Sequence, residues 1–242
     1  MKLDILAFGV HPDDVELSCA GVLLVEQLKG KKTGIIDLTQ GELGTRGTAG
    51  TRKLEATAAA KILGVDVREN LTMADGFFEN NEAHQRKIIT VLRTYQPEII
   101  LCNAPSDRHP DHGRSARLVA DGAFLSGLKK IETTKDGIQQ EAWRPKYVFN
   151  YIQDKFLQPD FVIDITAVFE QKVEAIKAYG TQFHNTDSNE PQTYISTPDF
   201  LDSVVYRHKW FGKMIGVKYA EGFISEKMIG FNNFDALIKN NT

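Results

Sequence analysis

The sequence predicts an α/β fold in which a mostly parallel β-sheet is covered by helices on both faces. Apolar runs of strand length alternate along the chain with longer segments whose apolar residues recur at helical spacing. This alternation is typical of parallel sheets built from β–α–β units. The chain of 242 residues contains no linker-like break. We therefore expect a single Rossmann-like domain that spans residues 1–242.

The first half of the expected domain consists of two strand–helix units. Residues 3–10 form an almost continuous apolar run, and residues 15–29 carry apolar side chains near helical spacing. A second strand is expected at 33–39, before a loop that contains four glycines. The following helix, from 51 to 63, should end at Gly64, because glycine favours the left-handed conformation that closes many helices.

The pattern continues through the second half of the chain. Residues 65–71 predict a third strand and 84–95 a helix, while 98–103 form a strongly apolar strand after a proline. A helix is expected over 111–125. The remaining expected elements are strands at 146–152 and 161–165, a polar loop at 181–198, and helices at 166–179 and 199–215.

The composition argues against several classes of protein to which this chain could belong. A net charge of −3 argues against a broad nucleic-acid-binding face, which needs a basic excess. No apolar run approaches the roughly 20 residues that span a bilayer, and no signal peptide is recognisable. Cys19 and Cys102 lie in apolar surroundings, so we expect reduced core cysteines in a cytoplasmic protein. We expect a homo-oligomer that acts on a small molecule.

Two motifs of metal-binding residue types stand just beyond two expected strands. The sequence HPDD occupies residues 11–14, and HPDH occupies residues 109–112. The loops at the carboxyl ends of strands in an open α/β sheet converge on one crevice, where ligands bind. Three of the six histidines fall in these two motifs. The sequence therefore predicts one site built from two distant segments.

The residue types in these motifs favour a catalytic zinc site. His11 and Asp14 are three positions apart and can face one point at a helix entrance, and His112 can supply a third ligand. Three protein ligands with one open position are typical of catalytic zinc, and iron or cobalt would also accept them. The alternative is that Asp13 or Asp14 simply caps the next helix. The presence of both motifs in equivalent positions favours the metal site.

The other motif residues suit hydrolysis of an amide or ester. Asp13 is expected to act as general base toward water, and His109 to stabilise an oxyanion and protonate the leaving amine. Asp111 is expected to orient a neighbouring imidazole. The glycine-rich phosphate-binding motifs and the serine nucleophile motif that would indicate other enzyme classes are absent from the sequence.

The two motifs, their order and the α/β pattern resemble the LmbE/PIG-L family of zinc-dependent de-N-acetylases. Within that family the chain is most similar to the bacillithiol-biosynthesis deacetylases, through residues 37–39, 52–53, 107–112 and 219–223. The resemblance covers nearly the whole chain. It implies removal of an acetyl group from an N-acetylglucosamine conjugate, with N-acetylglucosaminyl malate as the expected substrate.

The same resemblance implies roles for single residues. It implies zinc ligation by His11, Asp14 and His112, a general base at Asp13, and an electrostatic or acid partner at His109. Two alternatives remain: a zinc amidase that acts on another small N-acyl molecule, and a non-catalytic protein that binds sugar through its metal. An unligated carboxylate at Asp13 favours an enzyme.

Candidate substrate-binding residues lie near the motifs. Arg52 follows the glycine-rich loop, and its planar guanidinium could grip a carboxylate or a sugar hydroxyl. Arg108 immediately precedes the second motif and could contact the same group. Glu42 is a polar loop residue that could line the cleft. The remaining histidines are expected to be ordinary polar or partly buried residues; they are His84, His184 and His208.

Overall fold

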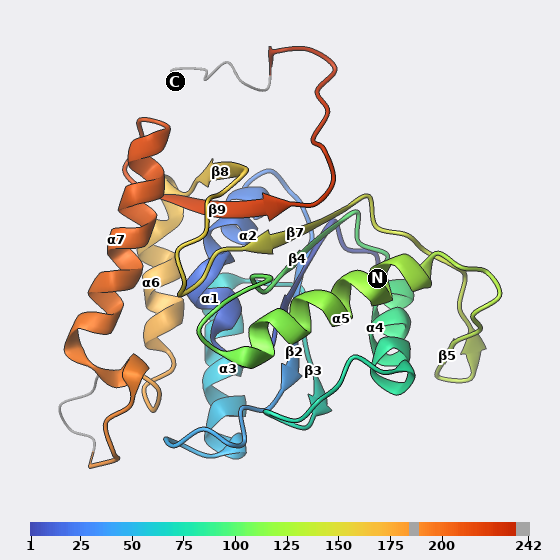
Figure 1. Ribbon diagram of the computed structural model, residues 1–242, viewed down its shortest axis with the longest axis horizontal. Helices are drawn as coiled ribbons and strands as arrows, with labels where there is room; N and C mark the ends of the chain where they lie inside the picture. Colours follow the sequence, from blue (N-terminus) through green and yellow to red (C-terminus); the bar gives the residue numbers. More distant parts are fainter. Residues whose placement is uncertain (184–188, 236–242) are drawn as a thin grey trace.

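In the computed structural model, which describes residues 1–183 and 189–235, seven strands form one central sheet (Figure 1). Five neighbouring strands are parallel, and the last two run antiparallel to their neighbours. The expected mostly parallel sheet is thus confirmed. In order across the sheet, the strands are β3 (Val67–Met73), β2 (Thr33–Thr39), β1 (Ile5–Gly9), β4 (Ile99–Cys102), β7 (Tyr147–Tyr151), β9 (Ala220–Ser225) and β8 (Phe161–Asp164).

Helices cover both faces of the sheet, as expected (Figure 1). One layer contains α1 (Asp14–Ser18), α2 (Ala20–Gln27), α3 (Ala49–Leu63), α6 (Phe169–Lys177) and α7 (Pro198–Met214). The opposite layer contains α4 (Glu82–Tyr95) and α5 (Pro110–Ser126). Two short 3₁₀ helices, η1 (Thr166–Val168) and η2 (Tyr194–Ser196), precede α6 and α7.

The alternation of side chains along β1 explains the two helical layers. Ile5 and Ala7 are buried in the core beneath the larger helical layer. Leu6 and Phe8 point to the opposite face and are buried against α4 and α5. A strand that is apolar on both sides is typical of a parallel sheet whose two faces are both covered.

The strand order creates a crevice beside β1. The chain passes from β1 to β2 on one side, whereas β4 pairs with the other side of β1. Such a reversal of strand order opens a crevice at the carboxyl ends of the strands, and ligands bind there in open α/β sheets. The loop after β1 and the loop after β4 both lead into this crevice, and they carry the two motifs.

Some elements differ from the sequence-based expectation. The expected helix at 15–29 is divided at Cys19, whose φ of −138° and ψ of 9° end α1 before α2 begins. The strand β9 was not expected, and neither was the hairpin of β5 (Thr134–Lys135) and β6 (Ile138–Gln139). Part of the expected loop at 181–198 forms η2, and residues 184–188 lie outside the described residues.

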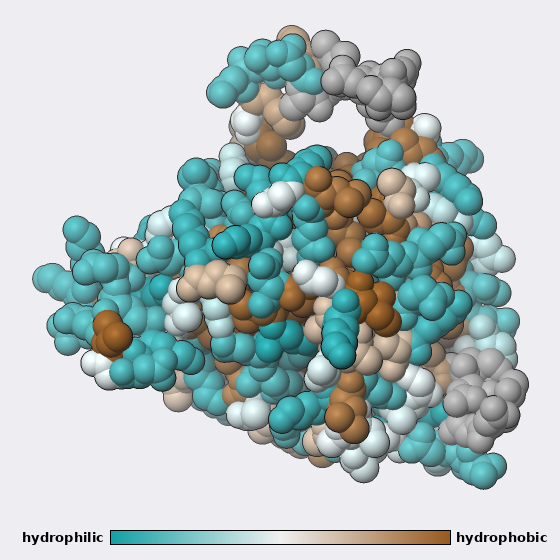
Figure 2. Space-filling view, turned by 180° about the vertical axis from the view of Figure 1, so that it is seen from behind, coloured by the Kyte–Doolittle hydropathy of each residue, from teal (hydrophilic) through white to brown (hydrophobic). Residues whose placement is uncertain are grey.

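The features outside the crevice concern the surface, the C-terminal segment, the cysteines and the length of the helices. Seen from behind, the molecule is largely hydrophilic, with separate hydrophobic patches (Figure 2). The segment that follows β9 extends away from the sheet (Figure 1). Cys19 and Cys102 are buried and free, in agreement with the expected reduced state. Among the described residues, no helix has the length and hydrophobicity needed to cross a bilayer.

Candidate active site

A cavity of about 370 Å³ opens at the carboxyl edge of β1 and β4. Residues of both motifs line it, together with residues from the glycine-rich loop, α3, α7 and η2. Seven of the nine candidate site residues face this cavity: His11, Asp13, Asp14, Arg52, Arg108, His109 and His112. Glu42 and Asp111 do not line it, although each contacts residues that do. The structure therefore brings the two distant motifs together, as expected.

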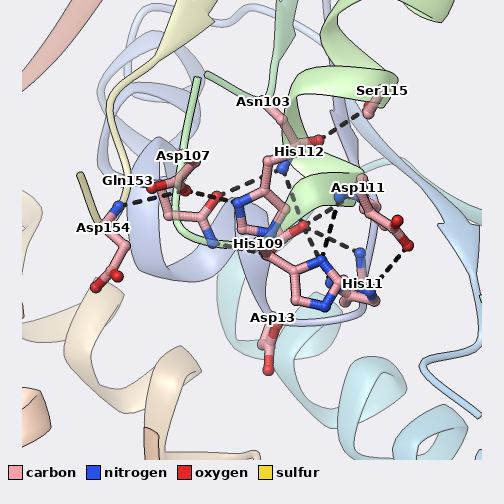
Figure 3. A network of polar contacts seen from close by, with 12 residues as sticks. His11, Asp13, Asn103, Asp107, His109, Asp111, His112, Ser115, Gln153 and Asp154 are labelled. Atoms are coloured by element: carbon pink, nitrogen blue, oxygen red, sulfur yellow. Dashed lines mark hydrogen bonds and ion pairs between the residues drawn. The ribbon is translucent and has the colours of Figure 1, made fainter. Parts of the chain in front are cut away.

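Three imidazoles form the centre of the site (Figure 3). One ring nitrogen from each of His11, His109 and His112 lies within 4.8 Å of the others. The ring centroid of His109 is 4.7 Å from that of His11 and 5.4 Å from that of His112. Imidazole nitrogens in such a cluster can supply ligands to a metal cation.

Asp14 lies beside two of these rings and is buried. Its Oδ1 is 3.3 Å from Nε2 of His112, and its Oδ2 is 3.8 Å from Nδ1 of His11. The carboxylate also accepts hydrogen bonds from the backbone N–H groups of Val10 and His11 and from the side chains of Asn103 and Gln153. Burial would raise the pKa of Asp14, but the His112 and His11 imidazoles and the hydrogen bonds from His112 and from the His11 backbone hold it well below its ordinary value of 3.8. Asp14 is therefore an anion at neutral pH.

Two carboxylates behind the imidazoles fix the orientation of the rings. Asp107 Oδ2 is 2.6 Å from Nδ1 of His112, and Asp75 Oδ1 is 2.9 Å from Nε2 of His11. These contacts leave Nε2 of His112 and Nδ1 of His11 directed toward Asp14. Carboxylates that bind the second nitrogen of a metal-ligating histidine are a common feature of metal sites. The donor set of His11, Asp14 and His112 thus fits a divalent metal such as zinc.

The protonation of His112 reflects the concentration of acids around it. Burial would lower its pKa, but Asp14 and Asp107 raise it to about 10. An imidazole between two carboxylates becomes protonated. Its positive charge then balances the two carboxylates, as a bound metal ion otherwise would. The electrostatic field of this pocket therefore favours a bound cation.

Asp13 occupies a strained and buried position next to this centre. Its φ is 130° and its ψ is −22°, a region that residues other than glycine rarely adopt. Its side chain makes no capping hydrogen bond to α1, so the capping alternative does not apply to Asp13. Burial raises its pKa to about 7, and the guanidinium of Arg52 opposes that rise. A carboxyl group with this pKa can exchange protons at neutral pH.

Arg52 is held against Asp13 by α3 and by the glycine-rich loop. Its Nη1 is 3.0 Å from Asp13 Oδ2 and donates a second hydrogen bond, of 2.7 Å, to Pro12 O. Gly41, with a φ of 65°, packs so closely that an added Cβ would lie 3.2 Å from the guanidinium carbon. Both the turn and the close approach require glycine at this position. The glycine-rich loop thus positions Arg52 toward Asp13.

His109 is the N-cap residue of α5 and faces the cavity. Its Nδ1 accepts the backbone N–H of Asp111, so a neutral ring carries its proton on Nε2. Burial and the imidazoles of His11 and His112 lower the pKa of His109 below 6.5. The expected link to Asp111 therefore passes through the backbone of that residue. The Asp111 carboxylate instead accepts hydrogen bonds from Gly76 N and from Arg114, and its closest imidazole contact is 4.0 Å, to His11.

Arg108 and Glu42 have polar partners that the sequence did not reveal. Arg108 donates to Asp154 at 3.0 Å and lies over the ring of Tyr194, whose hydroxyl also contacts Asp154. Glu42 accepts the backbone N–H groups of Gln40 and Asp75. Arg108 therefore links the second motif to η2, and Glu42 shapes the loop that places Asp75.

The remaining histidines lie outside the cluster. His84 contacts Glu79 near the start of α4, and buried His208 contacts Ala220 O. His184 lies outside the described residues. Sequence reasoning missed Asp75 and Asp107. Of the two, Asp107 lies in the segment 107–112, which carries part of the family resemblance, and could have been recognised there.

Comparison with known proteins identifies the family. Residues 6–123 match the family described as PIG-L: GlcNAc-PI de-N-acetylase. The crystal structure of the conserved protein TT1542 from Thermus thermophilus is 33% identical, with a TM-score of 0.83, over 95% of this chain and 97% of that chain.

Two curated relatives carry named activities. Diacetylchitobiose deacetylase of Thermococcus kodakarensis is 26% identical over 90% of this chain and 81% of its own length. A 4-oxalmesaconate hydratase of Pseudomonas putida is 25% identical over 74% of each chain. The family match covers both motifs, and the Thermus protein matches nearly the full length. The chain therefore belongs to the PIG-L family and is a deacetylase, an enzyme that hydrolyses amide bonds.

Proposed function

We propose that this enzyme removes the acetyl group from an N-acetylglucosamine conjugate in the cytoplasm. The proposed substrate is N-acetylglucosaminyl L-malate, an intermediate of bacillithiol biosynthesis. One observation carries the reaction: Asp13, Asp14 and the three clustered imidazoles, which could hold a metal ion, line the same cavity. The similarity to a diacetylchitobiose deacetylase supports an N-acetylated sugar as the substrate. The bacillithiol assignment rests on the sequence resemblance.

We propose that His11, Asp14 and His112 hold a zinc ion. The carboxylates Asp75 and Asp107 support this proposal because each orients a histidine of the set. When bound, zinc supplies a Lewis acid for amide hydrolysis. Asp14 and His112 come from different motifs, so the proposed site also fixes the two loops relative to each other.

Asp13 is the proposed general base. Its carboxyl group takes a proton from the water that attacks the acetyl carbonyl carbon, and the pKa of about 7 suits this transfer at neutral pH. The ion pair with Arg52 fixes the Asp13 side chain, since one oxygen is held at 3.0 Å. In Figure 3 the Asp13 carboxylate lies below the imidazoles, on the side of the cavity that α3 borders.

His109 is the proposed partner of the developing negative charge. The N–H group at Nε2 can donate a hydrogen bond to the oxyanion that forms from the acetyl carbonyl. It can then transfer its proton to the leaving amine, and the proton that Asp13 took from the water replaces it on the ring. The backbone N–H of Asp111 keeps Nδ1 occupied, and the Asp111 carboxylate anchors this turn to Gly76 and Arg114. Asp111 would therefore position His109 through the start of α5.

The substrate-binding assignments follow from the cavity. Arg52 and Arg108 line it and are proposed to contribute positive charge to substrate binding. Because Nη1 of Arg52 is committed to Asp13, we also propose that Arg52 positions the base. Glu42 is proposed to act on binding through the loop that carries Asp75 and not by direct contact.

Acetate release by the zinc-loaded enzyme tests the proposal. N-acetylglucosaminyl L-malate should be the best of three substrates, with N-acetylglucosamine and N,N′-diacetylchitobiose as the others. Faster hydrolysis of another N-acetyl sugar would replace the malate conjugate. The hydratase among the relatives supplies a second reaction to test. Hydration of a 4-oxalmesaconate-type substrate without any acetate release would overturn the sugar-deacetylase proposal.

A further inference from the structure

Four arginines line the cavity, and three of them have a carboxylate partner. Nε of Arg46 is 3.7 Å from Glu190, Nη1 of Arg52 is 3.0 Å from Asp13, and Nε of Arg108 is 3.0 Å from Asp154. The fourth is Arg207, on α7. Across residues 1–183 and 189–235, no carboxylate oxygen lies within 4.0 Å of its guanidinium. Its charge therefore has no carboxylate partner among these described residues.

The surroundings of Arg207 are poor in polar partners. Its Nη2 donates a hydrogen bond of 3.1 Å to Leu17 O, whereas its Nε is fully enclosed and has no hydrogen-bond partner. Leu17, Phe200 and Val204 line the same cavity and provide an apolar wall. The guanidinium therefore has one enclosed N–H group without an acceptor, while the side chain as a whole is half-buried and lines the cavity.

Such a group is unfavourable in the absence of a ligand. Burial lowers the pKa of Arg207 to about 10, although Asp154, Asp107 and Glu221 oppose this from a distance. The side chain is still cationic at neutral pH. A partly buried cation without a paired anion and an enclosed N–H group without an acceptor both destabilise a fold. An anion that enters the cavity with the substrate would pair with the charge of the accessible part of the guanidinium.

We propose that Arg207 binds an anionic group on the aglycone of the substrate. The inference rests on the proposed function and deepens it, because it names the residue that selects a charged conjugate over a neutral one. Arginine binds carboxylate and phosphate oxygens through its planar N–H groups, so both anions fit this chemistry. We take the carboxylate as the expected anion, and a phosphate-bearing substrate is included in the test.

The test compares Arg207→Gln and Arg207→Lys with the wild type and with Arg117→Gln. Arg117 is exposed on α5 and pairs with Asp121, so it controls for loss of an arginine outside the cavity. Three substrates are used: N-acetylglucosaminyl L-malate, N-acetylglucosamine 1-phosphate and neutral methyl N-acetylglucosaminide. The quantity measured is the ratio of kcat/KM for each anionic substrate to kcat/KM for the neutral one. Circular dichroism and thermal unfolding check that each variant is folded.

For Arg207→Gln, the ratio for the malate conjugate should fall about 10- to 100-fold, mainly through KM, the range expected for a charged hydrogen bond. Arg207→Lys should retain part of the ratio, and Arg117→Gln all of it. A fall confined to the phosphate substrate would reassign the anion to phosphate. Equal losses on all three substrates would overturn the proposal and leave Arg207 with a structural role.

Calorimetric binding of glucosaminyl L-malate, the deacetylated conjugate, separates this proposal from the proposed function. Weaker binding to Arg207→Gln than to the wild type supports the anion site even if the wild type releases no acetate from any substrate. Absence of acetate release by the wild type would refute the proposed deacetylation of these sugars, but it would not refute the role of Arg207. Unchanged binding of glucosaminyl malate would refute the role of Arg207.

Discussion

Nη1 of Arg52 lies 3.0 Å from Oδ2 of Asp13, and both side chains are buried at the wall of the cavity. This ion pair connects α3, which follows the glycine-rich loop, to the first motif after β1. It also suggests a second role for Arg52, which was expected from the sequence to grip a carboxylate or a sugar hydroxyl of the substrate. Removal of one partner of such a buried pair is destabilising, because the other charge stays buried without compensation.

Replacement of Arg52 by glutamine should therefore impair catalysis on every substrate. We expect kcat to fall about 10- to 100-fold, because one charged hydrogen bond to the base is lost. The loss should be similar for N-acetylglucosaminyl malate and for methyl N-acetylglucosaminide. Steady-state kinetics on both substrates measure it, with Arg86→Gln, an exposed arginine of α4, as the control. A loss restricted to the malate conjugate would instead make Arg52 the residue that grips the carboxylate.

Replacement of Asp13 by asparagine should remove the base and preserve the fold. Asparagine has the same shape and tolerates positive φ better than most residues, so the strained turn at 130° should survive. We expect kcat to fall about 10²- to 10⁴-fold, the usual contribution of general acid–base catalysis. The metal content, measured by mass spectrometry, should stay near that of the wild type. Asp136→Asn is the matched control, because Asp136 is an exposed aspartate with a φ of 52° in the β5–β6 hairpin.

The fold was predictable because local patterns and tertiary structure agree over most of the chain. Residues 33–39 form β2 as expected, and α3 ends at Gly64, which adopts a φ of 65°. The hairpin turn at Asp136–Gly137, with both φ values positive, carried a recognisable turn signal that was not used. β9 was not predictable in the same way, because it pairs with β7 and β8, whose partner residues lie 56 to 76 positions away in sequence.

The site was predictable in its ligand types and not in its supporting contacts. The motif residues meet because they follow β1 and β4, neighbours in the sheet. Asp75 reaches His11 from a loop whose path depends on Glu42, and no pattern in the sequence indicates that contact. The partner of Arg108 was equally hidden, since Asp154 lies 46 residues away. Long-range polar contacts between loops leave no periodic signal in a sequence.

Replacement of Asp107 by asparagine should weaken metal binding without removing a proposed ligand. The Asp107 carboxylate is 2.6 Å from Nδ1 of His112 and orients that ring. Loss of such a supporting carboxylate typically lowers metal affinity about 10- to 100-fold. Competition with a chromophoric chelator measures the affinity, and Asp160→Asn, outside the cavity, is the control. His112→Ala should lose most of its metal in the same assay. Full metal retention by His112→Ala would contradict the ligand assignment.

Removal of one partner of the buried pair Lys172–Glu221 should strongly destabilise the fold. Both side chains are fully buried, and Nζ lies 2.5 Å from Oε1 of Glu221. Glu221 also accepts the N–H groups of Gly21 and Val22 in the first turn of α2, so it joins α6 and β9 to that helix. Removal of one partner of a buried pair typically costs about 3–5 kcal/mol, because it leaves an uncompensated charge. We expect Lys172→Met to lower the free energy of unfolding by an amount in that range.

A double-variant cycle gives the sharper test of this pair. In Lys172→Met combined with Glu221→Gln, neither charge remains, so the loss of unfolding free energy should be clearly smaller than the sum of the two single losses. Urea unfolding followed by circular dichroism measures all four proteins. The Gln side chain can still accept one N–H of α2 through its carbonyl oxygen, which keeps part of the helix contact. Strictly additive losses would mean that Lys172 and Glu221 stabilise the fold independently, through packing and through the helix contact, and not as an ion pair.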